Sequence, residues 1–106
     1  MSVTVPSADQ AQALYNFALD RSREEWEQAL ADDGLAEKHL DSVRRLANSN
    51  KTALAGTTAY LLACLSQGEN AQAARLWDVL TDCGEQWQEH PGWKAEWANP
   101  ARAALR

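Results

Sequence analysis

Apolar residues recur along most of this chain at the three- and four-residue spacing of amphipathic helices. No stretch alternates apolar and polar residues over more than a few positions, so strands have almost no support. Gly and Pro occur mainly where the helical patterns stop. The pattern therefore predicts an all-α protein, arranged as a four-helix bundle of antiparallel hairpins with a short C-terminal segment that carries tryptophans.

The first predicted helix begins after a proline, where Ser7 and Gln10 form a capping-box pattern. It is expected to run to about Asp32 and to stop at Gly34. Its apolar residues share one broad face: Ala11, Leu14, Tyr15, Ala18, Leu19, Trp26, Ala29 and Leu30. Phe17 lies on the opposite side among charged residues, so an internal core does not explain it.

Two further helices are predicted at about 35–47 and 52–68, separated by a loop at Asn48-Ser49-Asn50. His39 falls within the apolar stripe of the earlier one, where it would be a core histidine or, less simply, a base or pH switch. No charged residue occurs from Thr52 to Gly68. A helix that is apolar nearly all round is typical of one surrounded by neighbours, which indicates the central helix of the bundle.

Gly68 is expected to close the third helix and Asn70 to cap the fourth, so that the two form an antiparallel hairpin. Gly84 lies within the fourth helical pattern, where it either permits close packing or marks a bend. The sequence His90-Pro91-Gly92 ends the pattern.

Two stretches resemble known proteins. Residues 60–80 resemble a single tetratricopeptide-type hairpin through small and large residues at that repeat's positions: Leu61, Cys64, Gly68, Ala73, Trp77 and Leu80. The resemblance implies hairpin geometry, since stacked repeats need about three units. The tail from Trp87 to Trp97 resembles the ending of short uncharacterised actinobacterial and actinophage helical proteins. This resemblance implies a bacterial or phage origin and carries no activity with it.

Length and charge narrow the function classes. The 106 residues suit one helical domain, 1–106, with frayed ends at 1–6 and 101–106. A net charge of −5 argues against direct nucleic-acid binding, which needs a basic face. No apolar run reaches the length of a membrane span, and the N-terminus lacks a signal-peptide pattern, so we expect a cytoplasmic protein without a membrane role.

The residues that could carry chemistry are few. Cys64 and Cys83 should differ in height along the predicted hairpin by roughly 13 Å, too far for a disulfide. With His39 and His90 they form no metal-ligand spacing. The charged run at 20–27 is typical of a solvated helix face with Arg21–Glu25 and Arg23–Glu27 pairs. We expect no enzyme activity, no metal and no cofactor.

The chain has five tryptophans, and each could either pack in the core or contact a partner. Trp26 and Trp77 lie within apolar stripes and are predicted to be core, while Trp87 is core or border. Trp93 and Trp97 lie beyond the predicted stop, so they either fold back over the end of the bundle or project into a partner.

The leading functional hypothesis is a small, acidic, non-catalytic protein-binding module. It could be an inhibitor or regulator of a larger bacterial or phage assembly, or a self-associating subunit. The predicted partner-binding residues are Phe17, Asp20, Arg21, Glu24, Trp93 and Trp97. In this hypothesis Phe17 is an apolar anchor inside a charged rim. The alternative is a bundle that binds a small molecule in an apolar pocket lined by Trp77, Trp87 and His39.

Overall fold

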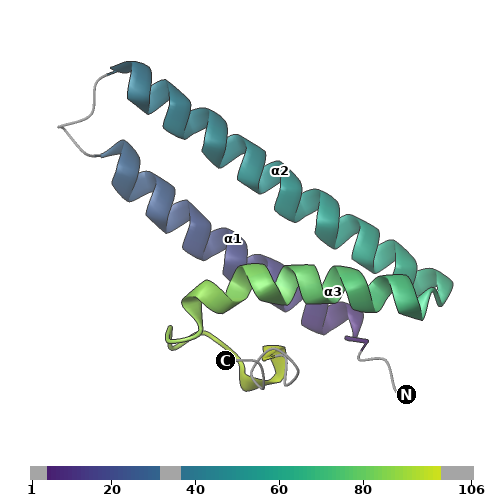
Figure 1. Cartoon of the computed structure of the whole chain (residues 1–106). Coiled ribbons are helices and arrows are strands. Elements are labelled where there is room, and N and C mark those ends of the chain that lie inside the picture. The colour runs from purple at the N-terminus through teal and green to yellow at the C-terminus, as the bar shows by residue number, and fades with distance from the viewer. Residues whose placement is uncertain (1–4, 32–36, 99–106) are drawn as a thin grey trace.

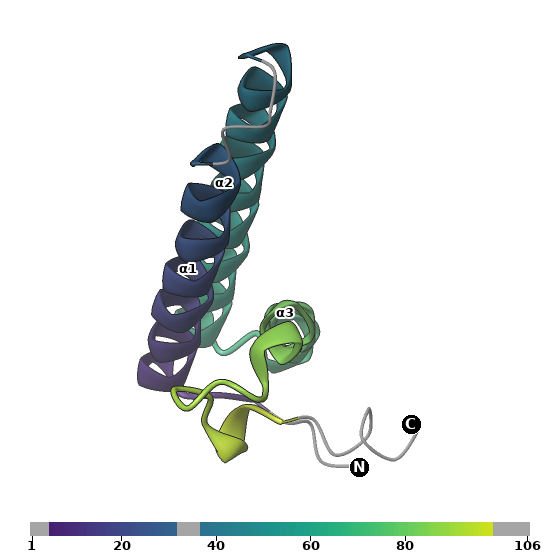
Figure 2. The same ribbon diagram turned by 90° about the vertical axis from the view of Figure 1, so that its left-hand side faces the viewer.

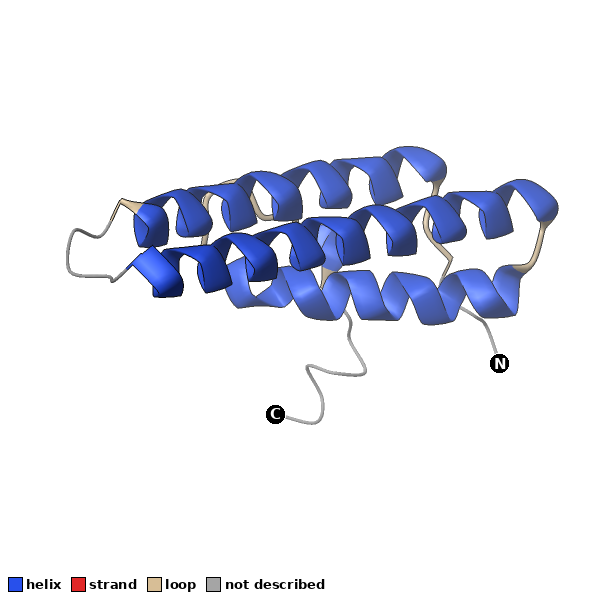
Figure 3. Ribbon diagram, turned by 90° about the horizontal axis from the view of Figure 1, so that it is seen from above, coloured by secondary structure: helices blue, strands red, loops and turns tan. Residues whose placement is uncertain are grey.

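The computed structural model describes residues 5–31 and 37–98. Within these ranges α-helices run at Ala8–Leu30 (α1), Glu37–Gln67 (α2) and Asn70–Gly84 (α3). Two short 3-10 helices follow at Glu85–Trp87 (η1) and Ala95–Trp97 (η2), and no strand occurs in the described ranges (Figure 3). The all-α prediction is confirmed. The four-helix bundle is wrong, because the described chain contains three α-helices.

The two predicted middle helices are one helix. α2 continues through the expected loop at Asn48-Ser49-Asn50. Asn and Ser cost only a few tenths of a kcal/mol each within a helix, about 0.7 at most, and no Gly or Pro breaks the chain there. The Asn50 side chain also finds a partner, because its Nδ2 donates to Ser22 Oγ at 3.3 Å. Thr52 Oγ1 donates to the backbone carbonyl of Asn48 at 2.9 Å, one helical turn earlier.

The predicted helix ends hold at two positions and shift at a third. Ser7 and Gln10 form both bonds of the capping box. Gly68 adopts φ 72°, and the Glu69 amide donates to the Cys64 carbonyl at 2.9 Å, which gives α2 a Schellman end. The N-cap of α3 is Glu69 rather than Asn70, and it caps without a side-chain hydrogen bond. The predicted stop of α1 at Gly34 lies outside the described residues.

Helices α1 and α2 form an antiparallel layer, and α3 lies on one side of it (Figures 1 and 2). α2 has 31 residues and α3 has 15, so α3 covers about half of α2. One end of the α1–α2 pair projects beyond α3 in Figure 1. Residues 22–30 and 37–50, which contribute no buried hydrophobic residue to the core, are named here the arm. The remainder of the described chain is the base.

The hydrophobic core lies in the base. Its buried members come from all three helices and the C-terminal segment: Ala11, Leu14, Ala18, Leu54, Leu61, Cys64, Ala73, Trp77, Leu80 and Trp97. Val5 packs against this core and Pro6 is buried, while residues 1–4 and 101–106 lie outside the described ranges. The uncharged stretch 52–68 is not a central helix, because Tyr60 is 53% exposed. Among the described elements α2 packs against α1 and α3, which leaves part of its surface open.

Candidate functional site

Phe17 lies at the centre of an aromatic cluster that joins α1 to the C-terminal segment. Its ring centroid is 5.3 Å from that of Trp97, 6.0 Å from Trp93 and 6.4 Å from Trp87. The His90 ring is 5.5 Å away. Most of these pairs meet edge to face, the arrangement that aromatic quadrupoles favour. The cluster therefore holds the segment after α3 against α1, at the edge of the hydrophobic core.

Polar contacts reinforce this attachment. The Arg21 guanidinium lies 5.5 Å from the centroid of the Phe17 ring, contacts the His90 imidazole, and pairs with the Glu24 carboxylate at 2.8 Å. Trp87 Nε1 donates to Glu25 Oε1 at 2.8 Å. Glu25 therefore binds the C-terminal segment instead of forming the predicted pair with Arg21.

The predicted partner-binding residues differ in how exposed they are. The expectation that Phe17 faces solvent is wrong, because the C-terminal segment half-buries it. Trp97 is only 2% exposed and Trp93 is half-buried, so the fold-back alternative holds for both. Asp20 and Glu24 are exposed, and the Arg21 side chain is 17% exposed.

Of the other residues predicted to lie in the core, one is buried and two are not. Trp77 is buried, as predicted. Trp26 is not core: it is half-buried in the arm, where no third helix covers it. His39 is exposed near the start of α2 rather than buried in an apolar stripe. Trp77, Trp87 and His39 therefore do not line a common pocket, since His39 belongs to the first turn of α2 and that end of α2 lies away from α3 (Figure 1).

Both cysteines carry free thiols, with Cys64 buried and Cys83 half-buried. Burial raises the pKa of the Cys64 thiol, and the hydrogen bond and charge of Glu69 raise it further. Burial also raises the pKa of Cys83, with a smaller contribution from the Asp82 charge. Because the thiolate is the nucleophilic form, both side chains act as small apolar groups at neutral pH.

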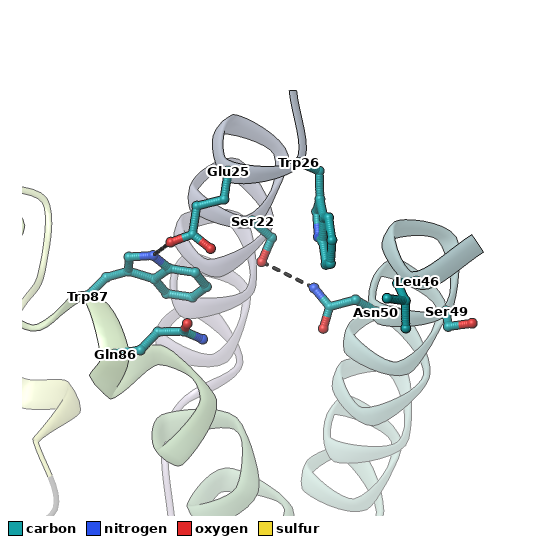
Figure 4. A pocket seen from close by; sticks show the side chains of 8 residues that line it. All are labelled: Ser22, Glu25, Trp26, Leu46, Ser49, Asn50, Gln86 and Trp87. Carbon is teal, nitrogen blue, oxygen red and sulfur yellow. Dashed lines mark hydrogen bonds between the residues drawn. The ribbon is translucent and has the colours of Figure 1, made fainter. Parts of the chain in front are cut away.

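An open groove lies where the arm meets the end of α3 (Figure 4). Its volume is about 430 Å³. The lining comes from α1, α2 and η1: Ser22, Glu25, Trp26, Leu46, Ser49, Asn50, Gln86 and Trp87. Trp26 and Trp87 supply its apolar walls, and most of the other lining side chains are polar.

A second surface runs along α2. The three large apolar side chains that are prominently exposed in the described chain are Leu46 at 60%, Tyr60 at 53% and Val79 at 58%. Leu46 and Tyr60 belong to an exposed, uncharged row with heptad spacing, named here the α2 seam: Leu46, Ser49, Ala53, Gly56, Tyr60 and Ala63. A groove of about 160 Å³ between α2 and α3 borders it, with Ala53 and Val79 in its lining.

Sequence reasoning missed the α2 seam because it assigned residues 46 and 53 to different helices. The signal was present in the seven-residue repeat of Leu46, Ala53 and Tyr60 and in the absence of charge after Thr52. Once α2 is continuous, these positions share one face, since seven residues make nearly two turns.

Two kinds of feature are absent from the part of the chain that the structure describes. They contain no group of three or more His, Cys, Asp or Glu side chains placed to hold a metal ion. None of the helices in the described ranges is both long and apolar enough to cross a membrane. The two surfaces above are open, and their lining is apolar or neutral polar except for Glu25 in the first.

Comparisons of this chain with protein-family models, with curated proteins and with solved structures give no match, so its function is inferred from its own residues.

Proposed function

We propose that this protein is a small, non-catalytic protein-binding module that receives an amphipathic helix along the α2 seam. The observation that carries the proposal is the row of six exposed, uncharged residues at heptad spacing on one helix. A helix that packs in coiled-coil fashion needs such a row on its partner. A module of this kind acts by capturing a helix of a larger assembly, as a regulator or an accessory subunit.

The size of the seam residues suits a close helix contact. Large side chains at Leu46 and Tyr60 flank the small residues Ser49, Ala53 and Gly56. A Cβ added at Gly56 would meet no atom within 4 Å, so the surface is open there. Small residues allow two helix axes to approach to the short end of the usual range, about 8 Å. Leu46 and Tyr60 would then act as anchors, and the small residues between them would contact the backbone of the bound helix.

The border of the seam extends the apolar surface onto α3. Val79 is exposed next to the groove that separates α2 from α3, and Cys83 lines the same groove. Burying one such side chain stabilises a complex by about 1–2 kcal/mol. Several anchors are therefore needed for micromolar binding, which requires about 8 kcal/mol. Leu46, Tyr60 and Val79 supply three, and the Trp26–Trp87 groove adjoins Leu46.

Small-molecule binding is the weaker candidate. The 430 Å³ groove between Trp26 and Trp87 has a suitable size for a ligand. Two of the three expected lining residues, Trp77 and His39, lie elsewhere. The groove is also open, so it encloses little of a small ligand's surface (Figure 4).

Selection from a displayed library of 18-residue amphipathic helices, with the intact protein as bait, tests the proposal. We expect selected peptides to lose at least tenfold in affinity for Ala53→Asp, because the new carboxylate lies in the seam. The matched control is Ala59→Asp, an exposed alanine on the same helix outside the seam. Helical binders that respond equally to both variants, or a library that yields no binder, would contradict the proposal.

A further inference from the structure

The face of the α1–α2 layer opposite α3 carries a groove of its own. Figure 2 shows α3 on only one side of this layer. On the arm, a groove of about 370 Å³ lies between α1 and α2. Its lining is Arg23, Trp26, Glu27, Leu30, Arg44, Ala47, Asn48 and Lys51. No member of the α2 seam belongs to this lining, so the two surfaces are separate.

Burial divides the lining into a floor and two rims. Trp26, Leu30 and Ala47 are half-buried and apolar, and they form the floor. The exposed rim on α1 carries Arg23 and Glu27. The exposed rim on α2 carries Asn48 and the other two cations of the groove, Arg44 and Lys51. An apolar floor therefore lies between two rims that each carry positive charge.

The charge of this groove is opposite to that of the protein. The chain has 15 acidic and 10 basic residues, a net charge of −5. The groove lining holds three cations and one carboxylate. Arg44 pairs with Asp41 at 3.0 Å, whereas Arg23 and Lys51 form no ion pair with the described residues. One cation on each rim is thus available to a ligand.

We propose that this groove binds an acidic amphipathic helix of a partner protein. The apolar face of that helix would pack on Trp26, Leu30 and Ala47, and its flanking carboxylates would meet Arg23 on one side and Lys51 on the other. Two parallel helix ridges with a floor between them match the shape of a third helix. A nucleic acid fits less well, because the chain outside the groove is strongly acidic and would repel phosphates.

Fluorescence anisotropy on the intact protein tests this inference. The probe is a labelled 18-residue helical peptide with leucines along one face and glutamates on both flanks. We expect saturable binding that weakens as salt concentration rises. The double variant Arg23→Glu/Lys51→Glu should weaken it at least tenfold. The matched control is Arg75→Glu, an exposed arginine on α3 that does not line the groove, and it should leave the affinity within twofold.

Three further measurements distinguish an acidic helix from other possible ligands of the groove. A peptide with lysine in place of every glutamate should not bind. An oligothymidylate of 20 nucleotides that binds as tightly as the acidic peptide would replace the inference with a general anion site. A dimer in sedimentation velocity that dissociates in Arg23→Glu/Lys51→Glu would identify a second copy as the occupant instead. Because Ala53→Asp should leave the acidic peptide bound, failure here is distinct from failure of the α2 seam.

Discussion

At the scale of single residues, burial in this protein depends on where the C-terminal segment returns. Trp97 follows the end of α3 by thirteen positions, yet it is among the most buried large side chains in the described chain. Trp26 sits within the regular apolar face of α1 and remains half-exposed. The difference arises because Trp97 packs against Phe17 in the base, while Trp26 lies on the arm, where it lines two open grooves.

Truncation of these two tryptophans should therefore have unequal effects. Trp97→Ala should lower the free energy of unfolding by about 3–5 kcal/mol, as for other large buried residues. Trp26→Ala should lower it by about 1–2 kcal/mol, because a smaller apolar area leaves contact with the protein. Urea denaturation followed by circular dichroism measures both. A larger loss for Trp26 would show that the arm, rather than the aromatic cluster, carries the core.

At the scale of elements, two helical glycines have opposite surroundings. Gly84 ends α3 where a Cβ would lie 3.0 Å from Leu14 Cδ1 and 3.1 Å from Trp93 Cζ3. Of the two sequence-based alternatives for this glycine, close packing applies. Gly56 lies inside α2, and a Cβ there would have no atom within 4 Å. The first glycine therefore reflects packing, and the second leaves a surface open.

Alanine at these positions gives a matched pair of variants. Gly56→Ala should raise the free energy of unfolding by about 0.5–1 kcal/mol, because alanine loses less backbone entropy in a helix. Gly84→Ala should lower it, since the added methyl group crowds Leu14 and Trp93 by more than helix propensity recovers. Thermal melts of the two variants beside the wild type measure both signs. Stabilisation by both would mean that α3 does not approach Leu14 closely.

At the scale of the whole molecule, the base and the arm differ in what holds them together. None of the buried hydrophobic residues of the described core belongs to the arm segments 22–30 and 37–50. The arm is two helices packed against each other without a third. Such a pair buries apolar surface on one face only, which leaves both of its grooves open to partners and gives it fewer stabilising contacts.

Hydrogen exchange should reveal this division along the single helix α2. Amides at 40–50 should exchange by local opening and show clearly lower protection than amides at 54–64, which adjoin Leu54, Leu61 and Cys64 of the core. Exchange measured residue by residue by NMR at neutral pH provides the comparison. Uniform protection across α2 would show that the arm unfolds only with the base.

The candidate binding surfaces were only partly predictable. The sequence predicted exposed charge at Asp20 and Glu24, and both side chains are exposed. It placed the apolar anchor at Phe17, because helical periodicity gives the direction of a side chain and not what another segment will lay against it. The α2 seam, and the groove that carries Arg23 and Lys51 on its rims, can be recognised only once α2 is known to be continuous and α3 to be short.

Features that local interactions decide were predictable from the residues alone. The helical periodicity predicted helices, and the capping box of Ser7 and Gln10 predicted where α1 begins. Gly68 predicted the turn between α2 and α3. Three other features depend on tertiary contacts: Asn48–Asn50 stays helical, the tail covers Phe17, and Tyr60 faces outward. The physical reason is that a cap or a turn is satisfied within a few residues, whereas burial depends on surfaces brought together from distant parts of the chain.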